Sequence, residues 1–161
     1  ETEGILHKIK GILAETGGDG LTGHEQALLY QQIAALQAVV DLQTEKYPQG
    51  ITLALQAMAD LTDSDSLLYG WLNHFLGYAY EMAGDLEAAV KSFAMGTENS
   101  LKHKIPAGIL SRCEIGRIRK LQGRLRDAER EYRRALEFAA ETGMEREMVI
   151  FAQLGLGDVL M

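Results

Sequence analysis

The sequence contains the stretch Leu76-Gly77-Tyr78-Ala79-Tyr80-Glu81-Met82-Ala83-Gly84-Asp85-Leu86. A second stretch follows 39 residues later, counted from Gly77 to Gly116, and reads Ile115-Gly116-Arg117-Ile118-Arg119-Lys120-Leu121-Gln122-Gly123-Arg124-Leu125. Small and large apolar residues fall in the same columns of the two stretches, and a further step of 39 reaches Gly155. A fixed period of about 20–50 residues is typical of proteins whose units bury their apolar faces only against neighbouring units. We therefore predict a solenoid.

Each unit of this repeat has the pattern of two helices. Apolar residues recur at steps of three and four from Leu67 to Met82, and again from Leu86 to Phe93. That spacing places them on one face of a helix, and Gly84-Asp85 between the two segments indicates a turn. We expect Gly77 and Ala89 to let the two helices approach closely beside Phe93, with the same roles in the next unit for Gly116, Ala128 and Tyr132.

Leu76-Gly77 is followed by Tyr80, and Ala89 is followed four residues later by Phe93. These spacings resemble the Leu-Gly-x-x-Tyr and Ala-x-x-x-Phe pattern of tetratricopeptide repeats. The chain departs from that pattern at Asn73, where tryptophan often stands, and in its period, which is longer than the common 34. The resemblance implies an all-α fold, a right-handed superhelix of helical hairpins (an α-solenoid).

The longer period, with Gly-Asp-Leu-Glu-Ala-Ala at 84–89 and the arginine-rich run at 122–137, narrows the resemblance. Both stretches resemble the repeat region of large MalT/LuxR-type ATP-dependent transcription regulators, over most of Glu25 to Met161. We expect a single domain with a leading helix at about 5–16, repeats at about 25–61, 67–101 and 106–142, and a half repeat at 145–161. We expect this to be a fragment of a longer protein.

Composition restricts the classes of function. The chain has 161 residues, 47% hydrophobic and 24% charged, which are values of a globular domain with a real core. A formal net charge of −7 argues against a nucleic-acid-binding surface. The single cysteine, the lack of a long apolar run and the lack of a secretion signal favour a cytoplasmic protein without membrane contact.

Motifs for catalysis or metal binding are lacking in this sequence. The four histidines, at 7, 24, 74 and 103, form no pair at helical metal-site spacing, and no P-loop or Gly-x-Ser-x-Gly motif occurs. The glycine-rich stretch at 17–23 is interpreted as a linker, and the acidic cluster at 62–66 as a capping turn rather than a calcium loop. We expect no enzyme, no catalytic residues, no metal and no cofactor.

Positive charge gathers in one repeat. Residues 106–134 hold nine of the sixteen basic groups against four carboxylates. This positive island could attract an anionic ligand or an acidic partner segment, or its charges could be paired within the helix, as Asp127 with Arg130 and Glu129 with Arg133. Pairing within one helix explains the positive charges of Arg117 and Lys120 less readily.

In tetratricopeptide repeats the first helix of each hairpin lines a concave groove that holds ligands. The resemblance carries the groove positions onto these residues: Trp71, His74, Tyr78, Glu81 and Met82 in one repeat, and Leu110, Cys113, Arg117, Lys120 and Leu121 in the next. Our candidate binding residues are Trp71, His74, Tyr78, Glu81, Cys113, Arg117 and Lys120. Trp71, Met82, Leu110 and Leu121 could equally be packing residues, and Cys113 a buried structural thiol.

The resemblance implies non-catalytic binding of a protein, a peptide or a small-molecule inducer, as the sensor or scaffold segment of a bacterial MalT/LuxR-like regulator. A free-standing adaptor for a partner peptide and an accessory domain of a larger enzyme are the alternatives. Apolar residues of the half repeat would remain partly uncovered, so we also expect chains to associate through that end; these residues are Leu154, Leu156, Val159 and Leu160.

Overall fold

The computed structural model describes residues 4, 7, 8, 11, 22–60, 66–143 and 146–161. Within these residues it consists of helices without strands: α2 (Gly23–Gln43), α3 (Tyr47–Asp60), α4 (Ser66–Met82), α5 (Leu86–His103), α6 (Ala107–Leu121), α7 (Leu125–Thr142) and α8 (Arg146–Leu160). The leading helix expected at about 5–16, the linker and the acidic cluster at 62–66 fall largely outside the described residues.

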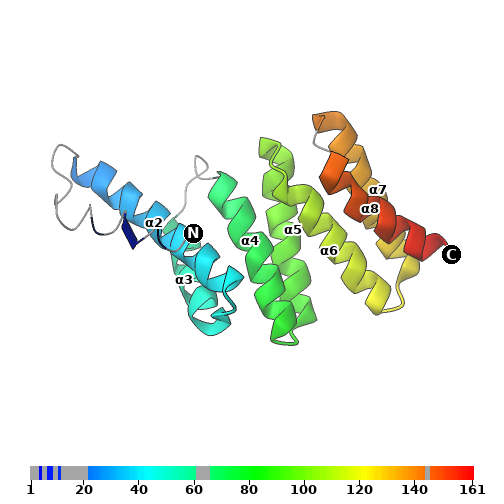
Figure 1. Cartoon of the computed structure of the whole chain (residues 1–161), viewed down its shortest axis with the longest axis horizontal. Coiled ribbons are helices and arrows are strands. Elements are labelled where there is room, and N and C mark those ends of the chain that lie inside the picture. Colours follow the sequence, from blue (N-terminus) through cyan, green and yellow to red (C-terminus); the bar gives the residue numbers. More distant parts are fainter. Residues whose placement is uncertain (1–3, 5–6, 9–10, 12–21, 61–65, 144–145) are drawn as a thin grey trace.

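The helices stand in consecutive pairs, α2 with α3, α4 with α5 and α6 with α7, and α8 packs against α7 and α6. Figure 1 shows these pairs following one another in a row along the long axis of the molecule. The first helices α4, α6 and α8 also contact one another in succession. The predicted all-α solenoid of helical hairpins is confirmed.

Local sequence explains where helices begin and end. Thr22 and Glu25 form a capping box at the start of α2, and the Asp85 carboxylate accepts a hydrogen bond of 2.9 Å from the Ala88 N–H at the start of α5. Gly84 and Gly123 occupy equivalent places in the turns after α4 and α6, with φ of 83° and 72°. Glycine adopts this left-handed backbone conformation at a lower energetic cost than other residues. The glycines that recur with the period therefore also fix the positions of the turns.

Close contact between a glycine and an aromatic ring joins the two helices of the second and third hairpins. A Cβ atom added at Gly77 would lie 2.5 Å from Cε1 of Phe93, and one at Gly116 would lie 2.9 Å from Cε1 of Tyr132. Phe93 is fully buried, and so are Ala89 and Ala128. The small residues therefore allow the close approach expected from the sequence, with the rings filling the space beside them.

Candidate functional site

A cavity of about 390 Å³ lies on the side of the first helices. Its walls come mainly from α4, α6 and α8, with the Tyr132 ring of α7 beneath. We name it the concave cavity; its lining residues are His74, Tyr78, Leu110, Cys113, Glu114, Arg117, Lys120, Tyr132, Phe151, Gly155 and Asp158. Three successive repeats therefore contribute to one site.

Five of the seven candidate residues line this cavity: His74, Tyr78, Cys113, Arg117 and Lys120. Trp71 lies one turn before His74 and contacts its ring edge-on, with centroids 5.6 Å apart. Glu81 lies beyond Tyr78 and forms an ion pair with Arg117. Neither Trp71 nor Glu81 lines the cavity, but each contacts a residue that does.

His74 is buried where α4 meets α6. Its Nδ1 lies 3.0 Å from Oγ of Ser111, and the rings of Trp71, Phe75, Tyr78 and Phe93 surround it. Burial lowers the pKa of His74 to about 4, so the imidazole is neutral at physiological pH. This side chain offers a ligand a neutral edge rather than a charge.

Polar side chains link the second repeat to the third. The Tyr78 hydroxyl donates to Glu114 at 2.6 Å, and Arg117 pairs with Glu114 at 2.6 Å and with Glu81. Burial, and then the hydrogen bond to Glu114, raise the pKa of Tyr78 above its usual value. Arg117 thus bridges carboxylates on two successive first helices.

Both cations of the cavity have carboxylate partners. Lys120 reaches across to α8, with its Nζ 2.9 Å from Asp158, while Arg117 contacts two glutamates. The expectation that pairing within one helix does not explain these cations holds for Lys120, whose partner lies on α8. It is wrong for Arg117, which pairs with Glu114 three residues before it on α6. Glu81 and Asp158 belong to neighbouring repeats, 36 and 38 residues away, where a search along one helix does not reach.

The chemistry of the cavity is suited to recognition. The Ser111 hydroxyl is fully buried, and burial raises the pKa of the Cys113 thiol to about 12, so both are poor nucleophiles. Paired charges, a tyrosine and the exposed ring of Phe151 instead offer hydrogen bonds and apolar contact to a ligand. Across the residues that can be described, no cluster of three potential metal ligands occurs, and no helix is long and apolar enough to cross a membrane.

The pairing expected on the second helix of the positive island is present. Arg130 lies 2.7 Å from Asp127, and Arg133 lies 2.7 Å from Glu129. Hydrogen bonds from Arg124 and Arg130 lower the pKa of Asp127. Much of the island is therefore balanced locally by carboxylates on the same helix.

Sequence reasoning missed the residues that the half repeat contributes to the cavity. Phe151, Gly155 and Asp158 of α8 line it, as does Glu114 of α6. The sequence did hold a signal for the place of α8, because the 39-residue period extends to Gly155. A Cβ atom at Gly155 would overlap the Tyr132 ring, so glycine there allows α8 to pack closely. That contact places α8 against the preceding hairpin, where it forms the third wall of the concave cavity.

Comparison with known protein families gives a match over most of the chain. A family model described as the MalT-like TPR region matches residues 31–161, which include every residue of the concave cavity. No curated protein and no solved structure matches the chain.

Proposed function

Because this chain belongs to the MalT-like TPR region family, we propose that it binds its ligand in the concave cavity as the sensor or scaffold segment of a MalT/LuxR-like transcription regulator. Repeats of this kind generally mediate protein interactions. The ligand would be a protein or peptide partner or a small-molecule inducer, and the protein would act in the cytoplasm.

The cavity between α4, α6 and α8 is the observation that carries this proposal. Its volume of about 390 Å³ falls within the range of roughly 300–1,000 Å³ usual for ligand pockets. Tyr78, Arg117 and Lys120 supply polar groups, and Phe151 supplies an exposed apolar surface. Because three repeats form the walls, a bound ligand would fix the positions of these repeats relative to one another. Binding would in this way change the conformation of the solenoid beyond the cavity itself.

The experiment begins with a thermal-shift screen of small sugars, nucleotides and peptides on the chain. Hits are titrated by calorimetry against wild type and against Arg117→Ala combined with Lys120→Ala. The matched control is Lys91→Ala combined with Arg126→Ala, which removes the same charge from exposed positions outside the cavity. We expect about tenfold weaker binding for the first variant and none of that loss for the control. Equal affinity in all three proteins would place the site elsewhere.

The two alternatives differ in what flanks the chain in the intact protein. An ATP-binding P-loop module before it and a helix-turn-helix after it would support the regulator. A free-standing adaptor has neither, and an accessory domain has a catalytic module beside it. Sequencing the gene on both sides decides among these three.

Association of chains through α8 is a further part of the proposal. Phe151, Leu154 and Leu160 are 60%, 64% and 59% exposed. Leu156 and Val159 pack against the core of the third hairpin instead. Large apolar side chains exposed on one helix favour contact with another protein surface.

A further inference from the structure

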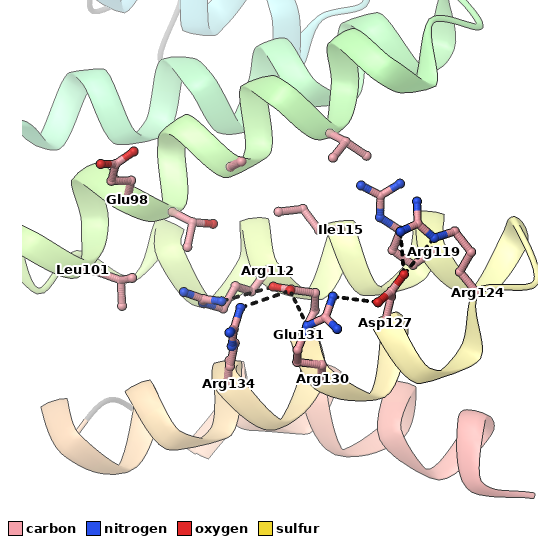
Figure 2. A pocket seen from close by; sticks show the side chains of 13 residues that line it. Glu98, Leu101, Arg112, Ile115, Arg119, Arg124, Asp127, Arg130, Glu131 and Arg134 are labelled. Carbon is pink, nitrogen blue, oxygen red and sulfur yellow. Dashed lines mark hydrogen bonds and ion pairs between the residues drawn. The ribbon is translucent and has the colours of Figure 1, made fainter.

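A second cavity, of about 430 Å³, opens on the opposite side, between the second helices α5 and α7, with α6 as its floor (Figure 2). We name it the outer cleft. Five arginines line it: Arg112, Arg119, Arg124, Arg130 and Arg134. None of these five lines the concave cavity, so the outer cleft is a separate surface.

The carboxylates of the cleft do not balance its arginines. Figure 2 shows Asp127 between Arg124 and Arg130, at 2.6 and 2.7 Å. Glu131 serves three arginines, Arg112 at 3.1 Å, Arg134 at 3.5 Å and Arg130 at 3.8 Å. With exposed Glu98 as the third acid, the lining carries five positive and three negative charges, a formal +2 in a chain of −7.

Two of the arginines have donors that meet no carboxylate or other acceptor within the described ranges, and those of Arg119 are open to a ligand. Arg119 donates to the Gln122 amide oxygen at 2.9 Å and has no carboxylate partner among the described residues. Arg112 is deeper, with a side chain 14% exposed, and its Nε finds no acceptor in the part of the chain that is described. A guanidinium has five N–H donors in a planar fork that matches a carboxylate, so Arg119 can take an acidic partner, whereas protein atoms enclose the Nε of Arg112.

The wall opposite α7 is mainly apolar, although Thr97 and Glu98 of α5 also line it. Val90, Ala94 and Leu101 follow one another along α5, and Ile115 of α6 continues the surface beneath them. Leu101 is 37% exposed and Ala94 is exposed as well. The cleft therefore presents an apolar wall beside a row of arginines.

The outer cleft is elongated. A neighbouring cavity of about 520 Å³ shares Val90, Arg119 and Arg124 with it and continues toward the start of α5. Arg112 and Arg119 are seven residues apart on α6, which is about 10 Å along a helix axis. Guanidinium groups strung along a groove suit a chain of carboxylates better than one phosphate group.

We propose that the outer cleft binds an acidic amphipathic segment of a partner protein. A carboxylate of that segment pairs with Arg119, and its apolar side chains lie against the α5 wall at Val90 and Leu101. Amphipathic segments bind grooves in this way, with apolar anchors supplying affinity and charges setting orientation. This site does not depend on the concave cavity or on a regulatory role.

The test uses a fluorescent peptide of about twelve residues with glutamate and leucine at helical spacing. Fluorescence anisotropy gives its Kd for wild type, for Arg119→Glu and for Ala94→Glu, which adds a negative charge at an exposed position of the α5 wall. Arg126→Glu is the matched control, because Arg126 is exposed on α7 outside the cleft. Circular dichroism confirms that each variant is folded.

We expect Arg119→Glu and Ala94→Glu each to weaken binding by about tenfold and Arg126→Glu to change it little. A peptide with serine for leucine should bind more weakly, since the apolar wall loses its contact. The proposal is overturned if all three variants bind alike, or if millimolar inorganic phosphate displaces the peptide completely. It is also overturned if a single-stranded DNA of similar charge binds more tightly than the peptide.

Discussion

Nδ1 of His74 lies 3.0 Å from Oγ of Ser111, a hydrogen bond that joins α4 of one repeat to α6 of the next. Both residues are buried, with His74 4% exposed and Ser111 not at all. Burial lowers the pKa of His74 to about 4, and protonation would place a charge among four aromatic rings at a boundary between repeats.

Stability should therefore fall on mild acidification. In the unfolded chain His74 takes up a proton near its ordinary pKa of 6.5, whereas the folded protein resists it until about pH 4. The stabilising effect of neutral His74 is complete above the unfolded value and is lost as pH falls from about 6.5 toward 4. Urea unfolding at about pH 7.5 and 5 should differ by roughly 2 kcal/mol from this residue.

His74→Gln is the control for this prediction, because glutamine can hydrogen-bond Ser111 and does not titrate. The variant should be less stable at neutral pH but should lose about 2 kcal/mol less than wild type between the two pH values. An identical pH dependence in both proteins would assign the acid sensitivity to other groups.

Gly77→Ala should destabilise the second hairpin. The added Cβ would lie 2.5 Å from Cε1 of Phe93, and that ring is fully buried, so it cannot turn away. We expect a loss of about 1–3 kcal/mol in the free energy of unfolding, against the gain of up to about 1 kcal/mol that alanine gives a helix. Gly157→Ala in α8, with no atom within 4 Å of its added Cβ, should show only that gain.

Phe93→Leu combined with Gly77→Ala tests the same contact from the other side. The smaller side chain makes room for the Cβ, so the two losses should add up to more than the double variant shows. If the losses in the free energy of unfolding are strictly additive in chemical denaturation, overlap with the Phe93 ring is not what destabilises Gly77→Ala.

The sequence predicted those features that depend on the repeat or on one helix turn. Period and apolar spacing suffice for the hairpins and for the contact of Gly77 with Phe93, and a three-residue step suffices for Asp127 with Arg130. Pairs such as Lys120 with Asp158 could not be predicted, because they depend on how one hairpin is offset against the next. The outer cleft could not be predicted for the same reason, because its lining depends on the relative positions of three helices.

Cys113 should react slowly in the folded protein. Its side chain is 6% exposed, and burial raises its pKa to about 12, so the thiolate fraction at pH 8 is about a thousandfold below that of a free cysteine. It is the sole cysteine of the chain, so modification with Ellman's reagent reports on it alone. We expect slow labelling in buffer and complete labelling in denaturant; rapid stoichiometric labelling of native protein would disprove the burial of this thiol.

Leu154→Glu should abolish association through α8. Leu154 is 64% exposed beside Phe151 at 60%, and a carboxylate there would have to be buried without a partner in any contact between two such helices. Light scattering of wild type should give a mass that rises with protein concentration, whereas the variant should remain a monomer. Leu55→Glu is the matched control, since Leu55 is 50% exposed and belongs to α3, a helix near the opposite end of the solenoid from α8 (Figure 1). It should associate as wild type does, and a wild-type protein that is strictly monomeric at high concentration would refute association through this helix.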